Sequence, residues 1–183
     1  MNLPNKLTVT RMVLTPVFLL VVTLPFIPHP INLYIGFAVY LAGSVTDFLD
    51  GKIARKYNLI TVFGQLADPV ADKMLTTAAL LVFLENGACD VYTVFIILTR
   101  EFAVTAVRLA AAAQGVVIPA NIWGKLKTAS QMIFSMVILA SMAFGLQLVL
   151  LAAPVMMWIT AVLAVISGII YIAKGVKLID FNR

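Results

Sequence analysis

The chain has 183 residues, of which 62% are apolar and only 11% are charged. A soluble domain carries about 25% charged residues, and the mean hydropathy here is +1.05, so the composition excludes an ordinary water-soluble globule. Since each membrane span takes about 20 residues, six spans leave room only for termini and short connections. We therefore expect a single membrane domain over residues 1–183.

Six apolar stretches follow one another along the chain, and long, uniformly apolar runs favour helices over the strands of a barrel. The predicted fold class is therefore all-α, with six transmembrane helices. No small-x-small cleavage site follows the first stretch, which argues against a signal peptide. The predicted spans are Leu7 to about Ile27, Ile31 to about Ala54, about Gly64 to Leu84, Val91 to about Ala113, and two spans sharing the uncharged stretch Thr128–Ala173, with a turn at residues 145–147.

Lysine and arginine gather on one side of this predicted topology, and the loops of the other side contain none. The positive-inside rule then places both termini in the cytoplasm. We attribute the net charge of +5 to contact with lipid headgroups and not to nucleic-acid binding. The absence of a presequence favours a bacterial plasma membrane, and the single Cys89 and single His29 are expected to be bystanders. The cytoplasmic basic residues are Lys6, Arg11, Lys52, Arg55, Lys56, Lys125, Lys127, Lys174, Lys177 and Arg183.

Four of the eight acidic residues lie near the cytoplasmic ends of the second and third predicted spans: Asp47, Asp50, Asp68 and Asp72. Spacings of three and four residues place each pair on one helical face, so two antiparallel helices can direct all four carboxylates to one point. Clustered carboxylates repel one another, and oxygen ligands in this number suit Mg²⁺ or Mn²⁺. The cluster predicts a site for two divalent cations, as in enzymes that transfer phosphoryl groups.

Two other interpretations of the acidic cluster are open. In one, the acids form ordinary ion pairs at the membrane surface with the neighbouring basic residues Lys52, Arg55, Lys56 and Lys73. In the other, they form the relay of a cation or proton carrier. Carriers usually hold such groups near the bilayer midplane between repeated halves, whereas these acids lie at one membrane face and the second half of the chain has no counterpart.

The residues around the acids, DFLDGKIAR, then eight residues, then GQLADPVAD, resemble the signature D-x-x-D-G-x-x-A-R-x(8–9)-G-x-x-x-D-x-x-x-D of the CDP-alcohol phosphotransferases. Four segments also resemble the branch of that family that makes phosphatidylglycerol phosphate: PNKLTVTR, DPVADK, TREF and GKLKTASQM. The resemblance extends to about Met132. Every fixed position of the signature is met, by Asp47, Asp50, Gly51, Ala54, Arg55, Gly64, Asp68 and Asp72.

This resemblance implies a homodimeric membrane enzyme that uses CDP-diacylglycerol and sn-glycerol 3-phosphate and releases CMP. It assigns Asp47, Asp50 and Asp68 to two divalent cations, Mg²⁺ or Mn²⁺, and it makes Asp72 a general base that also touches a metal. The signature indicates that the substrate carries a CDP group, but it does not identify the acceptor alcohol. Inositol phosphate and serine are therefore open as alternative acceptors, and only the flanking segments and the basic residues favour glycerol phosphate.

The resemblance also places small and basic residues along the CMP moiety, because glycines let a ligand approach the backbone. Asn5 and Thr8 in the N-terminal segment are candidate polar contacts to the same moiety, with helix capping as the other interpretation. Arg11 is expected to reach the lipid headgroups. The residues along the CMP moiety are Gly51, Ala54, Arg55 and Gly64.

An acceptor that carries a phosphate needs a cationic pocket near the acids. Arg108, Lys125 and Lys127 lie at the cytoplasmic ends of the fourth and fifth predicted spans, and a guanidinium suits bidentate phosphate contact. Arg100 lies about 12 Å deeper than Arg108, so we expect Glu101 or an acid of the cluster to neutralise it, and a structural role competes with binding. For the two lysines, anchoring at the membrane surface is the other interpretation.

Overall fold

A computed structural model describes residues 2–56, 61–116, 118 and 121–178, without the side chains at 48–56, 62, 65 and 66. Over these ranges the chain forms six α-helices and no strand, which confirms the all-α prediction. The helices are α1 (Leu3–Thr23), α2 (Ile31–Lys56), α3 (Val62–Glu85), α4 (Val91–Ala113), α5 (Ile122–Phe144) and α6 (Gln147–Leu178).

Polar side chains cap four of the helices at their N-termini. Asn2 caps α1, Thr61 caps α3, Asp90 caps α4 and Asn121 caps α5, each by accepting a hydrogen bond from a backbone N–H three residues later. These bonds satisfy N–H groups that have no partner within the helix. The short polar connections between apolar stretches therefore fix where α1, α3, α4 and α5 begin.

Several helix boundaries differ from the sequence predictions, among them the start of α1 at Leu3 in place of Leu7 and the end of α6 at Leu178, beyond Ala173. The first helix ends at Thr23 and not near Ile27, because the residue before Pro25 is restricted to extended conformations. The fifth helix begins at Ile122, ahead of the uncharged stretch, so the basic residues before Thr128 lie inside its first turns. The predicted turn at 145–147 is confirmed, since Gly145 ends α5 with φ +69°, a conformation that favours glycine.

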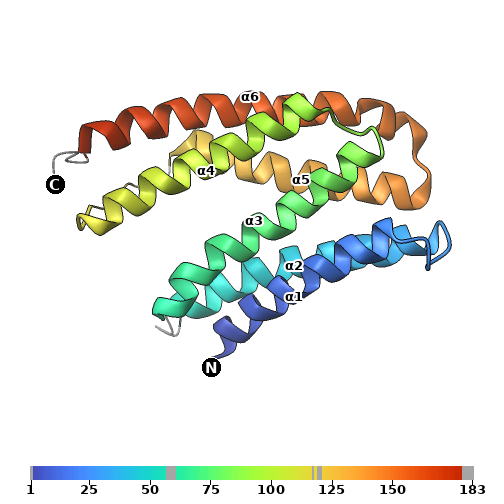
Figure 1. The fold of residues 1–183 in the computed structure, drawn as a ribbon, viewed down its shortest axis with the longest axis horizontal. Coiled ribbons are helices and arrows are strands. Elements are labelled where there is room, and N and C mark those ends of the chain that lie inside the picture. The colour runs from blue at the N-terminus through green and yellow to red at the C-terminus, as the bar shows by residue number, and fades with distance from the viewer. Residues whose placement is uncertain (1, 57–60, 117, 119–120, 179–183) are drawn as a thin grey trace.

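The helices lie in two groups of three (Figure 1). In one group, α1 packs against both α2 and α3; in the other, α6 packs against both α4 and α5. The groups meet where α2 contacts α5 and where α3 contacts α4. Because successive helices alternate in direction, both termini lie at one end of the bundle, and the connections after α1, α3 and α5 lie at the other (Figure 1).

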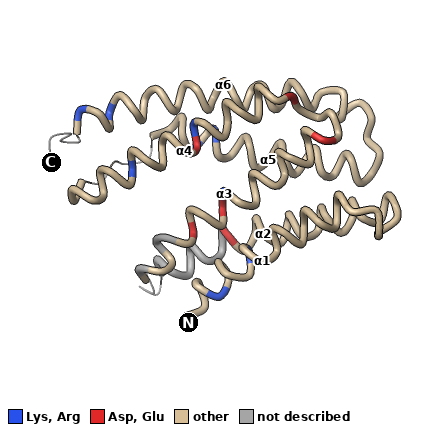
Figure 2. The backbone as a smooth tube through the Cα atoms, in the orientation of Figure 1, with Lys and Arg blue, Asp and Glu red and all other residues tan. Residues whose placement is uncertain are grey.

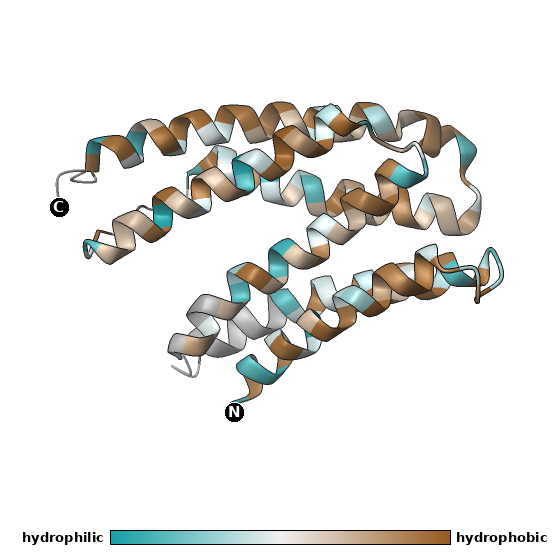
Figure 3. Cartoon of the chain, viewed as in Figure 1, coloured by the Kyte–Doolittle hydropathy of each residue, from teal (hydrophilic) through white to brown (hydrophobic). Residues whose placement is uncertain are grey.

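Apolar residues predominate along the helices (Figure 3), and many of the large ones are exposed, as expected for contact with lipid. Phe26, Phe95, Leu148 and Leu151 are all more than half exposed, and a soluble monomer rarely exposes so much apolar surface. In the described part of the chain, α1, α5 and α6 are long and apolar enough to cross a membrane. The helices α2, α3 and α4 have 23 to 26 residues but carry the clustered charges (Figure 2).

Candidate active site

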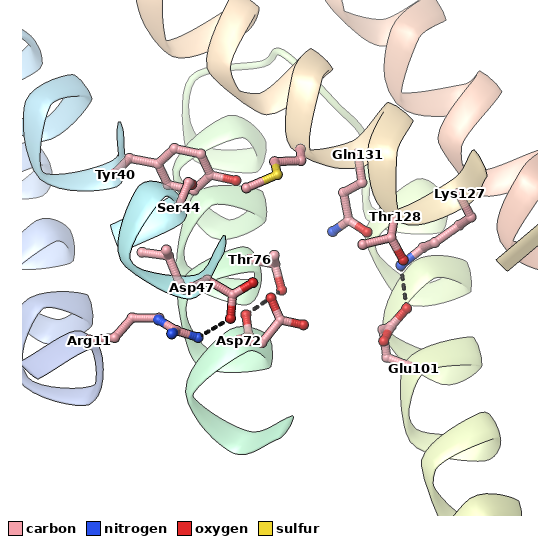
Figure 4. Close-up of a pocket in the computed structure, with 12 residues that line it drawn as sticks. Arg11, Tyr40, Ser44, Asp47, Asp72, Thr76, Glu101, Lys127, Thr128 and Gln131 are labelled. Carbon is pink, nitrogen blue, oxygen red and sulfur yellow. Dashed lines mark hydrogen bonds and ion pairs between the residues drawn. The ribbon is translucent and has the colours of Figure 1, made fainter. Parts of the chain in front are cut away.

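A cavity lies between the two groups of helices and draws its walls from α1 to α5 (Figure 4). We call it the central cavity. The charged residues in its wall are Arg11, Asp47, Asp72, Glu101 and Lys127. The two aspartates lie on the side of α2 and α3, whereas Lys127 and Glu101 lie opposite them on α5 and α4 (Figure 4). The cavity therefore brings acids of the cluster and a predicted acceptor-binding lysine to one place.

Three acids of the signature have described side chains, and they differ in their surroundings. Asp47 and Asp72 both line the central cavity, although they come from different helices. Asp68 lies one turn before Asp72 on α3, and its Oδ1 accepts a hydrogen bond of 2.5 Å from the Thr8 hydroxyl on α1. The side chain of Asp50 lies outside the described part of the structure.

Arg11 corrects one of the sequence predictions. Its side chain is fully buried and forms an ion pair with Asp47, whereas we expected it to extend to the lipid headgroups. A charge this far inside an apolar helix is expensive unless it has a partner, and Asp47 supplies that partner from α2. Arg11 is therefore part of the cavity wall.

A second set of ion pairs connects α4 to α5. The Glu101 carboxylate is paired with Lys127 and with Arg100, whose Nη1 lies 3.0 Å from it. This contact confirms the expected pairing of Arg100 with Glu101. Arg100 also donates from Nε to the Ser167 hydroxyl on α6, at 3.1 Å, and its guanidinium lies 5.9 Å from the Tyr171 ring centroid. These contacts join α4 to α6 and favour the structural interpretation of Arg100.

The predicted acceptor-binding residues do not share one location. Lys127 is 2% exposed and faces the central cavity. Lys125, two positions earlier on α5, is exposed, since a separation of two residues places side chains on different faces of a helix. Arg108 is also exposed, on α4. Only Lys127 of these three lines the cavity.

The described nucleotide-contact candidates lie together at the start of α1 and α3. The Oδ1 of Asn5 accepts a hydrogen bond of 2.9 Å from the Thr61 hydroxyl. A Cβ added at Gly64 would come within 3.1 Å of the same Oδ1, so the absence of a side chain there permits this contact. Thr8 is fully buried and bonded to Asp68, and the N-cap of α1 is Asn2, which excludes capping as the role of Thr8. The side chains of Ala54 and Arg55, and the position of Gly51 on its face of α2, lie outside the described part.

Carboxylates from two helices at one cavity are hard donors that fit Mg²⁺ or Mn²⁺. Asp47 and Asp72 supply them here. Among the described side chains, no group of three His, Cys, Asp or Glu residues is placed to hold a metal ion. Because Asp50 is outside that search, the chemistry of the donors fits a divalent cation, and the complete ligand set stays a prediction.

Several cavity residues were not identified as site residues from the sequence. The sequence does contain a signal for Arg11, since a charged residue within an apolar span usually forms a buried ion pair. Glu101 was expected only to neutralise Arg100, yet it also holds Lys127. Tyr40, Ser44 and Gln131 carry no charge, and an uncharged polar residue in an apolar helix gives no sequence signal that separates a cavity from a helix contact.

The comparison with known proteins is consistent with this geometry. Residues 1–166 match the family model described as CDP-alcohol phosphatidyltransferase. A Bacillus subtilis protein named CDP-diacylglycerol–glycerol-3-phosphate 3-phosphatidyltransferase is 37% identical over 184 residues, covering 95% of each chain. Proteins of the same name from Rickettsia typhi, 38% identical over 93% of this chain and 94% of its own, and from Haemophilus influenzae, 34% identical over 95% and 94%, are also similar. The chain therefore belongs to the CDP-alcohol phosphatidyltransferase family.

Proposed function

We propose that this protein transfers the phosphatidyl group from CDP-diacylglycerol to sn-glycerol 3-phosphate, giving phosphatidylglycerol phosphate and CMP. The observation that carries the proposal is the central cavity, in which Asp47 and Asp72 of the family signature face Lys127. The names of the relatives support both substrates. In this reaction an acceptor hydroxyl attacks the lipid-bearing phosphorus, and CMP leaves with the electrons of the broken P–O bond.

The negative charge of the diphosphate must be neutralised for an oxygen nucleophile to approach it. Asp47, Asp50, Asp68 and Asp72 would hold two divalent cations, Mg²⁺ or Mn²⁺, which supply this neutralisation as Lewis acids. The Thr8 hydroxyl fixes one oxygen of Asp68 by its hydrogen bond. Arg11 balances the charge of Asp47, and its ion pair keeps that carboxylate at the cavity wall.

Asp72 acts as the general base in this proposal. Its carboxylate lies in the cavity wall between the side of Asp47 and the side of Lys127 (Figure 4). A carboxylate at that position can take the proton from the acceptor's C1 hydroxyl, which makes the oxygen a better nucleophile. The Thr76 hydroxyl donates to the backbone carbonyl of Asp72 at 3.1 Å, so the Asp72 carboxylate stays available to the cavity.

Lys127 would bind the acceptor's phosphate. Its ammonium is buried and already paired with Glu101, whose carboxylate Arg100 also contacts. Because Arg100 remains to neutralise Glu101, Lys127 can turn its charge toward a phosphate dianion. Arg108 and Lys125, which are exposed at the same end of the bundle, would attract the anionic acceptor over longer distances.

The cytidine end of the donor would lie near the start of α1 and α3. Gly64 is buried beside Asn5 there, and Thr8, one turn further along α1, is bonded to Asp68 of α3. With these residues, the proposal assigns the remaining members of the signature, Gly51, Ala54 and Arg55, to the CMP moiety.

We also propose that all six helices cross the membrane, with both termini and the aspartates on the cytoplasmic side. Three of the helices meet the length and apolarity expected of a span. The connections at the other end, residues 24–30, 86–90 and 145–146, contain no Lys or Arg, which the positive-inside rule associates with the outer face. The homodimer that the family resemblance implies belongs to the same proposal and is tested by the mass of the purified protein in detergent.

An acceptor screen tests the proposed reaction. Purified protein in detergent is supplied with CDP-diacylglycerol, Mg²⁺ and one acceptor, and CMP release is measured. The proposal expects rapid release with sn-glycerol 3-phosphate and little with inositol phosphate or serine. Faster release with either of the other acceptors would contradict the assignment of glycerol phosphate. Ion uptake into sealed vesicles without any nucleotide would instead support a carrier.

A further inference from the structure

Gln131 is a buried residue that faces the central cavity and has no hydrogen-bond partner among the described residues. It lies on α5, is 4% exposed and lines the cavity one helical turn after Lys127. The labelled view shows its amide directed toward the cavity, on the side opposite Asp72 (Figure 4). The described side chains and backbone leave this amide without a hydrogen bond, although buried polar groups are nearly always hydrogen-bonded.

Two hydroxyl side chains close to Gln131 on α5 are bonded within their own helix. The hydroxyl of Thr128 donates to the carbonyl of Gly124 at 3.1 Å, and that of Ser130 donates to the carbonyl of Lys127 at 2.9 Å. Such bonds satisfy a hydroxyl within its own helix. Gln131 makes no such bond, so its amide N–H and C=O groups are available to a molecule in the cavity.

We propose that the Gln131 amide binds the C2 hydroxyl of the acceptor and thereby selects an acceptor with two neighbouring hydroxyls. The inference rests on the proposed function, in which Lys127 binds the acceptor's phosphate and Asp72 takes the proton from its C1 hydroxyl. Positions 127 and 131 are separated by a rise of about 6 Å along the helix axis. The C2 hydroxyl of glycerol 3-phosphate lies between the two ends that Lys127 and Asp72 hold, so it faces the wall that Gln131 forms.

An amide suits this task because it offers both a donor and an acceptor to one hydroxyl. A site with a buried polar group discriminates against a substrate that lacks the matching hydroxyl, since the group is then left without a partner. The structure thus assigns Gln131 to acceptor specificity, while the phosphate and the reacting oxygen are bound by charged residues. 3-Hydroxypropyl phosphate, which has the phosphate and the terminal hydroxyl but no C2 hydroxyl, is the matched probe.

The test compares kcat/KM for sn-glycerol 3-phosphate and 3-hydroxypropyl phosphate. The wild type should prefer glycerol phosphate by at least about tenfold, the worth of one hydrogen bond to a buried group. Gln131→Met, which keeps the volume and removes the amide, should lower the glycerol phosphate value and leave the other nearly unchanged, so the preference disappears. Gln131→Asn should retain part of it. Gln147→Met makes the same chemical change at an exposed position on α6, outside the cavity, and serves as the matched control that should keep the full preference.

The possible failures are distinguishable. A preference unchanged in both Gln131 variants, or an equal loss of activity with both acceptors in folded protein, would overturn the role of Gln131 and leave the proposed function intact. An absence of CMP release from the wild type with either acceptor would contradict the proposed function as well. Thermal unfolding of each variant establishes that the comparison is made on folded protein.

Discussion

Arg11 on α1 forms an ion pair with Asp47 on α2, so a fully buried cation neutralises one of the aspartates of the family signature. Carboxylates that gather in a membrane protein repel one another before any cation binds. The pair lowers this cost at Asp47 and also joins the first two helices. Arg11 therefore contributes both to the stability of the bundle and to the charge balance of the candidate metal site.

Replacing Arg11 with Gln should lower the melting temperature of the purified protein. The change leaves Asp47 without its counter-charge, and because that carboxylate side chain is 40% exposed, we expect a loss of about 1–3 kcal/mol, below the cost of a fully buried pair. Added Mg²⁺ should raise the melting temperature of the variant more than that of the wild type, since a cation replaces the missing charge. Lys6→Gln, an exposed site on α1, is the control. Equal melting temperatures for wild type and Arg11→Gln would contradict the structural role of the pair.

Asp72→Asn should lower kcat by about 10²–10⁴-fold, the contribution of a general base, while binding of CDP-diacylglycerol is largely retained. The amide keeps the shape of the side chain but cannot take a proton. Turnover and binding of the CDP-lipid are measured on the same preparation. Glu85→Gln makes the same chemical change at the exposed end of α3 and should leave both unaffected. Full turnover in Asp72→Asn would remove the residue from the mechanism.

Lys127→Met and Lys125→Met form a matched pair on one helix. We expect the Lys127 variant to raise KM for glycerol phosphate by about 10–100-fold, the worth of a charge-assisted hydrogen bond, with little change in KM for CDP-diacylglycerol. Arg100 still neutralises Glu101 in this variant, so the fold should persist. The exposed Lys125 should matter much less. Equal effects of the two substitutions would show that the cavity is not the acceptor's binding site.

Cys89 should react slowly with thiol reagents in the folded protein. It lies in the connection between α3 and α4, 7% exposed, and burial raises the pKa of its thiol to about 11. A free thiol has a pKa of about 8.5, so at pH 8 the thiolate fraction falls by about two orders of magnitude. Labelling should accelerate as the pH rises toward 11 and become rapid in denaturant. Fast labelling of the folded protein at pH 8 would contradict the buried position.

The sequence was sufficient to predict the order and approximate bounds of the helices. Apolar runs broken by Pro, Gly and polar residues determine where a helix can cross lipid, and this information is local. The apolar run continues to Ile27, but α1 ends at Thr23, because Pro25 restricts Leu24 to an extended conformation.

The site was only partly predictable for a different reason. The spacing of Asp68 and Asp72 is a property of a single helix, so it could be read from the sequence. The contacts of Arg11 with Asp47 and of Lys127 with Glu101 each join two different helices, and they depend on how those helices pack. For the same reason, nothing in the sequence alone separates the cavity-facing Gln131 from a glutamine that joins two helices.

The most direct test of the account is the dependence of CMP release on divalent cations. Purified protein is treated with a chelator, and CMP release from CDP-diacylglycerol and sn-glycerol 3-phosphate is measured before and after Mg²⁺ or Mn²⁺ is restored. The account predicts that the chelator abolishes release, that either cation restores it, and that Asp50→Asn is not rescued. CMP release that continues undiminished in the chelator would contradict the central claim that the aspartates act by holding divalent cations.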